Sequence, residues 1–263
     1  MKEQNKPMSH HLEVLRWHLI RGLAAMFLVS IGMYLMGNYF FDNVVLAHSS
    51  KDFFTYRFVC NNFASLCFYP EAFTFEAIGL EEQFITHIKV SLVMGFALSF
   101  PYVFWEIWSY IKPALYPNER KAAKGMVFIC SCLFFLGILF GYFIIAPFAV
   151  TFLSRYNVSQ MVEIVPRLNT YVNLLTMIIL PVGLIFELPV IVYFLAKVGL
   201  LTSSFMKRFR KHAVVVILIL ASFLTPPDVI TQFLIGIPFY MLYEIGIIIA
   251  KRVEKRRTNL SNN

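Results

Sequence analysis

The chain has 263 residues, of which 59% are hydrophobic and only 14% are charged, and its mean hydropathy is +0.68. One soluble core of this length could not hide so much apolar surface, so the composition excludes a soluble globular protein and indicates an integral membrane protein. The net charge of +8 does not indicate a nucleic-acid partner, because the basic residues gather where membrane topology alone would put them.

Four apolar stretches along the chain are long enough, at about 20 residues or more, to cross a membrane as helices. They are residues 19–41, 84–111, 126–153 and 171–195. Pro101 and Pro189 lie within these stretches, and proline bends a helix. Because bent helices can enclose a hollow, we expect a concave, cup-like bundle.

The last apolar region is too long for one span and is interrupted by two adjacent prolines, Pro226 and Pro227. Paired prolines cannot continue a helix, so they predict a tight turn. Asp228, directly after them, is expected to cap the following helix. We therefore predict a hairpin of two helices, residues 213–224 and 229–250, and an all-α membrane protein of six spans.

Lys and Arg accumulate in short cytoplasmic loops, and here their positions orient the spans. The basic clusters occupy residues 2–21, 112–124, 207–211 and 251–257. All four fall on the same side of the predicted spans, which places both termini in the cytoplasm. We expect one integral membrane domain over residues 1–263, with residues 1–18 forming an interfacial helix, residues 42–83 an extracytoplasmic loop and residues 251–263 a basic cytoplasmic tail. The first span is expected to be retained rather than cleaved as a signal peptide.

The long loop contains Cys60 and Cys67. If this side of the membrane is oxidising, the two residues are close enough in sequence to form a disulfide when the loop bends back, and two buried thiols fit the sequence equally well. No group of Cys and His residues has the spacing of zinc ligands, so we expect no metal site.

Glu187 is an acid inside the fourth apolar stretch. A carboxyl group at that depth costs roughly 2.5–3.5 kcal/mol on insertion scales, so such a residue is usually retained for a partner, a substrate or a proton. The chain has no nucleophile elbow, phosphate-binding glycine loop or metalloprotease motif. We therefore expect binding and conduction rather than enzymatic catalysis, and no cofactor.

Five short stretches stand out along the chain: His11–Arg16, Phe100–Pro101 followed by Lys112–Arg120, Phe186–Val190, Leu224–Gln232 and Tyr243–Gly246. Together they resemble one known family, the twin-arginine protein translocase subunit TatC. They occur in the family's order and with its spacing over nearly the whole chain. The resemblance implies the core subunit of a translocase that exports folded proteins across a bacterial plasma membrane and uses the proton gradient.

The resemblance also implies a receptor for the Arg-Arg signal peptides of exported proteins, with Glu119 as the receptor carboxylate. A carboxylate takes a guanidinium through two parallel hydrogen bonds, which a Lys ammonium cannot reproduce. A surface ion pair with the neighbouring Arg120 is the alternative for Glu119. The same surface would include Tyr110, Leu115 and Arg120, together with Glu13 and Arg16 from the N-terminal helix. This chain departs from the family in having Val14 where an acid directly before Leu-Arg is common.

For the transport step, the resemblance implies that single-span TatA- and TatB-type subunits bind near Glu187, and that the protein self-associates in a larger complex. Gln232 is a second polar group that could face a partner helix, with a hydrogen bond inside the C-terminal hairpin as the alternative. A secondary transporter with Glu187 as its proton or ion site is the competing function. It predicts an internal repeat, and none is visible in the sequence.

Overall fold

The computed structural model describes residues 8–62, 67–71, 73–112, 125–159, 161, 164–224 and 229–261. The chain divides into two compact units, each built from two separated segments. Unit 1 combines Met1–Phe41 with Gln83–Cys132, and unit 2 combines Asp42–Glu82 with Leu133–Asn263. The prediction of an all-α protein is confirmed in the described residues, where the only β-pairing is an isolated bridge between Glu76 and Arg167.

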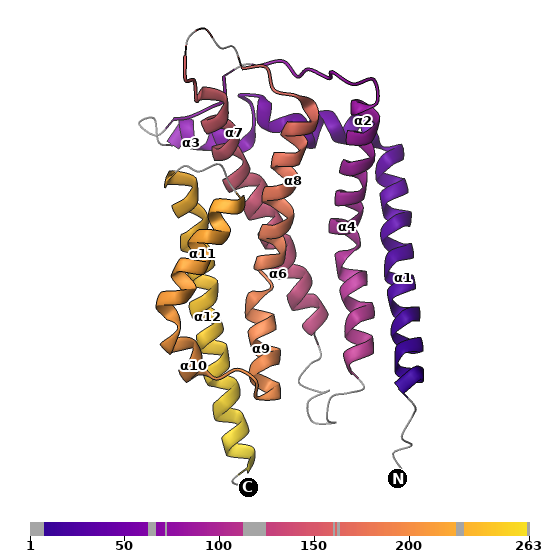
Figure 1. Cartoon of the computed structure of the whole chain (residues 1–263), viewed down its shortest axis with the longest axis vertical. Helices are drawn as coiled ribbons and strands as arrows, with labels where there is room; N and C mark the ends of the chain where they lie inside the picture. The colour runs from indigo at the N-terminus through magenta and orange to yellow at the C-terminus, as the bar shows by residue number, and fades with distance from the viewer. Residues whose placement is uncertain are drawn as a thin grey trace. The chain divides into compact units, whose positions relative to one another are not determined.

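Unit 1 is formed mainly by two long helices, α1 (Met8–Leu35) and α4 (Glu82–Ile111), with the short α2 (Gly37–Phe40) (Figure 1). The junction between the predicted interfacial helix and the first span, at residues 18 and 19, contains no proline. Helix α1 accordingly continues from Met8 through this junction to Leu35. Pro101 lies inside α4, which continues past it. Many large side chains of α1 are exposed, including Leu28 at 70% and Leu35 at 79%, as expected for a helix that faces lipid.

In unit 2, the segment predicted as an extracytoplasmic loop contains three short helices: η1 (Phe41–Val45), η2 (Leu46–Ser49) and α3 (Phe54–Asn62). They are anchored by polar groups on distant helices. His48 Nε2 donates to the carbonyl of Tyr142 at 2.8 Å, and the Tyr171 hydroxyl donates to the carbonyl of Val45 at 2.9 Å. Cys60 and Cys67 form a disulfide.

The third and fourth predicted spans are each divided into shorter helices. The third comprises α6 (Met126–Phe140), the π-helix η5 (Gly141–Ile145) and α7 (Ala146–Arg155), and Pro147 lies in the first turn of α7. The π-helical turn accommodates the proline without a break in the chain of helices. The fourth comprises α8 (Leu168–Ile185) and α9 (Leu188–Val198), with Pro189 in the first turn of α9.

The C-terminal part of unit 2 consists of α10 (Ser203–Arg208), α11 (Arg210–Leu224) and α12 (Val229–Ser261), with α11 beside α12 (Figure 1). Helix α12 extends through most of the residues predicted as a tail. Fully buried side chains from α8 and α12, including Ile178, Val182, Ile235 and Phe239, form the main core of this unit. Pro226, Pro227 and Asp228, predicted to form the hairpin turn, lie outside the described residues.

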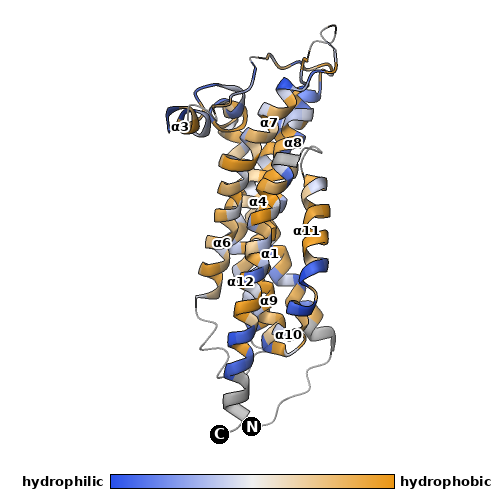
Figure 2. Ribbon diagram, turned by 90° about the vertical axis from the view of Figure 1, so that its left-hand side faces the viewer, coloured by the Kyte–Doolittle hydropathy of each residue, from blue (hydrophilic) through white to orange (hydrophobic). Residues whose placement is uncertain are grey.

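Within the described residues, five helical stretches are long and apolar enough to cross a membrane. They are Leu12–Leu35, Glu82–Ile111, Met126–Arg155, Leu168–Val198 and Thr231–Arg256. The sixth predicted helix is α11, whose 15 residues make it a short arm of the hairpin. Hydrophobic residues dominate these helices, and hydrophilic residues gather at the start of α11 and in the C-terminal part of α12 (Figure 2). The orientation of the termini and the concave shape stay predictions.

Candidate functional site

Glu187 lies at the break between α8 and α9, where the helical hydrogen-bond pattern changes. Its carbonyl accepts the first hydrogen bonds of α9, from the amides of Val190 and Ile191 at 3.0 Å each. The preceding residue, Phe186, packs its ring against that of Phe140 with the centroids 5.6 Å apart. Glu187 itself is only 7% exposed. The chain therefore holds an acid at a bend inside an apolar segment.

Gln232 lies on α12 and makes the intramolecular hydrogen bond that was the alternative to a partner contact. Its side-chain amide donates to the carbonyl of Leu218 on α11 at 3.2 Å. The neighbouring Thr231 is buried at 1% exposure. The Gln232 side chain thus links the two arms of the C-terminal hairpin, and its amide oxygen can accept a further contact.

The residues predicted to bind a signal peptide are only partly described. Glu13 and Arg16 are exposed on α1. Tyr110, half-buried in the last turn of α4, has its ring 6.2 Å from that of His18 on α1. Leu115, Glu119 and Arg120 lie outside the described residues.

Unit 1 contains a polar cluster that sequence reasoning missed. Glu106 of α4 is 3% exposed, and its two carboxylate oxygens contact His18 Nδ1 at 2.5 Å and the hydroxyl of Tyr102, which donates at 2.9 Å. Tyr102, Glu106 and Tyr110 follow one another at intervals of four residues, which puts them on one face of α4. An acid inside the predicted span 84–111 was the signal that could have indicated this cluster, just as it indicated Glu187.

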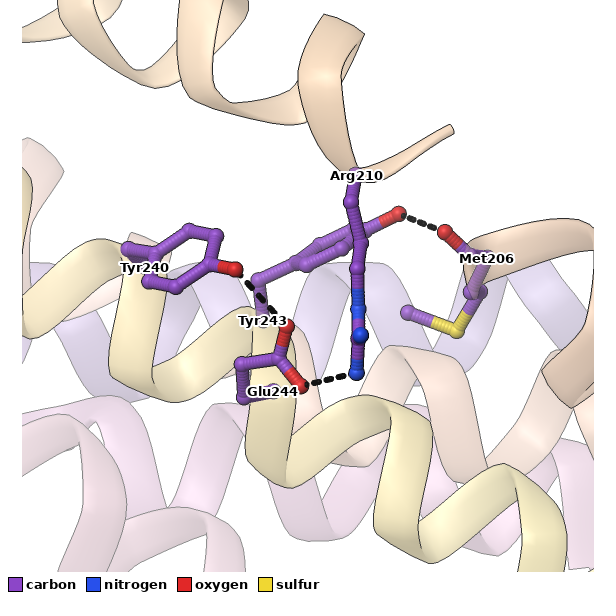
Figure 3. Close-up of polar contacts among 5 residues, drawn as sticks. All are labelled: Met206, Arg210, Tyr240, Tyr243 and Glu244. Atoms are coloured by element: carbon purple, nitrogen blue, oxygen red, sulfur yellow. Dashed lines mark hydrogen bonds and ion pairs between the residues drawn. The ribbon is translucent and has the colours of Figure 1, made fainter. Parts of the chain in front are cut away.

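A second missed cluster connects α11 and α12 (Figure 3). Arg210 at the start of α11 donates to one carboxylate oxygen of Glu244 at 2.7 Å, and Tyr240 donates to the other at 2.9 Å. Tyr243, on the same helix, donates to the carbonyl of Met206 in α10 at 2.7 Å. Both Glu244 oxygens are therefore used inside unit 2, which favours a structural role for this pair over ligand binding.

The part of the chain that the structure describes contains no group of three or more His, Cys, Asp or Glu residues that could hold a metal ion. The comparison with known families gives the decisive observation: the chain matches the Sec-independent protein translocase protein (TatC) family over residues 10–238. The chain belongs to the TatC family.

Full-length relatives support the assignment. The TatC protein of Blattabacterium sp. subsp. Periplaneta americana is 35% identical, over 97% of this chain and 99% of its own length. The TatC protein of Carboxydothermus hydrogenoformans is 34% identical, over 96% and 97%. A crystal structure of the twin arginine translocase receptor TatC matches with a TM-score of 0.70 and 28% identity, covering 93% of this chain and 99% of that one.

The TatC family is a component of the Sec-independent, twin-arginine protein translocase, a transport subunit rather than an enzyme. The chain is accordingly a multi-pass protein of the inner membrane that works in a complex with other Tat subunits. This confirms the family, the location and the coarse function predicted from the sequence. The roles of individual residues stay predictions.

Proposed function

We propose that this chain is the signal-peptide receptor of its translocase, and that Glu119 takes the arginine pair of the signal. The observation that carries the proposal is the segment Lys112–Arg120, which follows directly after α4 and resembles the family's receptor loop in sequence. A carboxylate there can pair with a guanidinium through two parallel hydrogen bonds. Tyr110, in the last turn of α4, supplies an aromatic ring on which a guanidinium can stack.

Site-specific crosslinking tests the receptor role. A photoreactive probe beside Glu119 is exposed to two signal peptides, one with Arg-Arg and one with Lys-Lys. We expect crosslinking to the Arg-Arg peptide, and its loss in Glu119→Ala, because hydrogen bonds to charged groups contribute about 1.5–3 kcal/mol and alanine removes the carboxylate that would accept them. Glu71→Ala, which removes an exposed carboxylate from a different segment, is the matched control and should leave the crosslink unchanged.

Equal crosslinking of both peptides, or none, would overturn the receptor role. That result would instead favour the competing function, a secondary transporter with Glu187 as its proton or ion site. The chain has no nucleotide-binding motif, so in either function the energy comes from elsewhere, and we propose the transmembrane proton gradient as its source.

Glu187 and Gln232 form the second part of the proposal, as contacts for the single helices of TatA- and TatB-type subunits. The position of Glu187 at a helix break inside an apolar stretch supports this role, because a carboxyl group there can hydrogen-bond a polar side chain on a partner helix. Gln232 retains one amide oxygen for the same purpose.

This part is tested by crosslinking from α12 to co-expressed single-span subunits. Glu187→Gln preserves a side chain of similar size with hydrogen-bonding atoms and should retain the crosslink, whereas Glu187→Ala should reduce it severalfold. Unit 2 must stay folded in both variants, which the melting temperature of the purified protein checks. A crosslink that survives Glu187→Ala unchanged would exclude Glu187 as a partner contact.

A further inference from the structure

Unit 2 contains an apolar cavity of about 170 Å³ between the end of α7 and the start of α8. Val150, Leu153 and Leu174 line it from the helices, and Phe73, Ile164 and Pro166 line it from the connecting segments. None of the proposed contacts for signal peptides or partner helices lies among these residues. The proposed receptor and partner contacts therefore do not account for this cavity.

Three polar residues contribute to the cavity wall: Thr170 is exposed, and the hydroxyls of the other two are bonded within the protein. The Tyr171 hydroxyl donates to the carbonyl of Val45 at 2.9 Å, and the Ser154 hydroxyl donates to the carbonyl of Thr151 at 3.0 Å. The wall is consequently suited to a hydrocarbon group rather than to a polar ligand.

Two cations lie close to this cavity, on the same aromatic ring. Lys51 Nζ is 4.9 Å from the centroid of the Tyr69 ring, and the guanidinium of Arg155 is 5.1 Å from it. Arg155 directly follows Ser154, a residue of the cavity wall. Within the described residues, neither cation forms an ion pair with an acid. Because both lie about 5 Å from the same ring centroid, the two charges are no more than about 10 Å apart, and this local excess of positive charge attracts an anion.

The position in the chain indicates which anion. Arg155 ends the apolar stretch Met126–Arg155, and the next such stretch begins at Leu168. The cavity and the cations thus lie where two candidate spans end, at the level of the polar headgroups of a bilayer. Basic side chains at this level can attract an anionic headgroup, and Arg binds phosphate with two parallel hydrogen bonds.

We propose that unit 2 binds one anionic glycerophospholipid here, with its phosphate at Lys51 and Arg155 and part of one acyl chain in the cavity. The volume fits this occupant, since an apolar cavity of roughly 150 Å³ accepts benzene and one of about 170 Å³ therefore accepts a short run of methylene groups. A transmembrane helix, with a diameter of about 10 Å, is too large for it.

Photolabelling of the full-length protein in lipid nanodiscs tests the proposal. The probe is phosphatidylglycerol with a diazirine in one acyl chain, and its match is phosphatidylcholine with the same chain. Labelled residues are mapped by mass spectrometry. We expect phosphatidylglycerol to label the segments around Val150 and Leu174 at least about fivefold more than phosphatidylcholine does, while both lipids label the exposed face of α11 at Val215 equally.

Variants distinguish the binding of the headgroup from the binding of the acyl chain. Lys51→Gln with Arg155→Gln should abolish the preference for phosphatidylglycerol, and the matched pair Lys207→Gln with Arg208→Gln, on α10, should leave it unchanged. Lys51→Arg with Arg155→Lys keeps both positive charges and should retain the preference for phosphatidylglycerol. This variant shows whether the loss in the Gln pair comes from the missing charges rather than from misfolding. Ile164→Trp, at the exposed edge of the cavity, should reduce cavity labelling by both lipids.

Equal labelling of the cavity by the two lipids in the unaltered protein would overturn the anionic site. A preference that survives in Lys51→Gln with Arg155→Gln would overturn the role of these two cations. Labelling confined to the outer faces of the helices would overturn the acyl-chain site.

Discussion

Gly137 on α6 and Gly183 on α8 allow the backbones of these two helices to pack directly against each other. A Cβ atom added at Gly137 would lie 2.8 Å from the Cα of Gly183 and 2.9 Å from the Cβ of Phe186. These are backbone and near-backbone atoms, which cannot rotate away, so any larger residue forces the helices apart. Small residues at helix interfaces allow such contacts in membrane proteins.

We expect Gly137→Ala to lower the stability of the protein by about 1–3 kcal/mol, the usual cost of overpacking. Gly32→Ala is the control, because a Cβ atom there would meet nothing within 4 Å and alanine favours a helix over glycine by about 1 kcal/mol. The midpoint of thermal unfolding in detergent measures both variants. A midpoint for Gly137→Ala equal to that of Gly32→Ala would contradict the close approach.

His48 gives unit 2 a predictable response to acid. Its ring is buried, donates to the carbonyl of Tyr142 at 2.8 Å and contacts the rings of Phe53 and Tyr142. Burial disfavours the charged imidazolium and lowers the pKa of His48 from 6.5 to about 4, with the hydrogen bond to Tyr142 as a smaller opposing effect.

Because the pKa of His48 is lower in the folded state, the unfolded state takes up the proton first as the pH falls. Stability is fully present above pH 6.5 and is lost between 6.5 and about 4, by up to roughly 3 kcal/mol. We expect the protection factors of the amides in residues 42–62, which relate each exchange rate to the intrinsic rate at the same pH, to fall over this range. The His48-dependent part of that fall should vanish in His48→Gln. His212→Gln, which alters an exposed histidine, should keep the wild-type pH profile.

At the scale of elements, the six-residue helix α10 depends on contacts from α12. Glu254 accepts hydrogen bonds from both the amide and the hydroxyl of Ser203, each at 2.6 Å. Thr202 caps the same end by accepting from the amide of Phe205. A helix this short does not persist alone in water, so the carboxylate of a distant helix helps to hold it.

Glu254→Ala should therefore loosen α10. We expect the amides of residues 203–208 to exchange roughly tenfold faster, which corresponds to about 1.4 kcal/mol of lost local stability. Lys251→Ala, an exposed change on the same helix, is the matched control. An exchange rate that rises equally in the two variants would show that Glu254 is not the residue that holds α10.

The elements that sequence could predict are those whose signal is local. Apolar length predicted the positions of the spans, and the two prolines after α11 predicted a hairpin with one short arm. The helices between residues 41 and 62 could not be predicted, because their anchors, such as the carbonyl of Tyr142 that binds His48, are nearly a hundred residues away. The π-helix η5 could not be predicted either, because a proline such as Pro147 indicates a bend in a helix but not which backbone hydrogen-bond pattern forms beside it.

For the candidate site, sequence could indicate which polar residues lie in apolar stretches but not which groups they contact. Glu187 stood out as an acid in an apolar stretch, and the structure finds it buried at a helix break. Glu106 carried the same signal, but only the structure reveals its partners, His18 and Tyr102. For Gln232, sequence left open whether the amide faces a partner helix or α11, and the bond to Leu218 shows an intramolecular contact.

For the whole molecule, the predicted topology places both termini in the cytoplasm. Cysteines introduced at Met161 and at Lys251, both exposed, test it in a Cys132→Ser background, because Cys132 is an exposed free thiol. We expect a membrane-impermeant maleimide to label Met161→Cys in intact cells, and Lys251→Cys only after the membrane is permeabilised. The reverse pattern would invert the topology.

Each unit is built from two separated segments of the chain, so residues of unit 2 that contact one another are synthesised at different times. His48 must wait for Tyr142, 94 residues later, and Val45 for Tyr171, 126 residues later. At about 5–20 residues per second, the nascent segment Asp42–Glu82 spends roughly 5–25 s without its partners. Its disulfide joins cysteines only seven positions apart, so it can close during this interval. The segment can therefore be crosslinked by its own disulfide before the residues that anchor it have been synthesised.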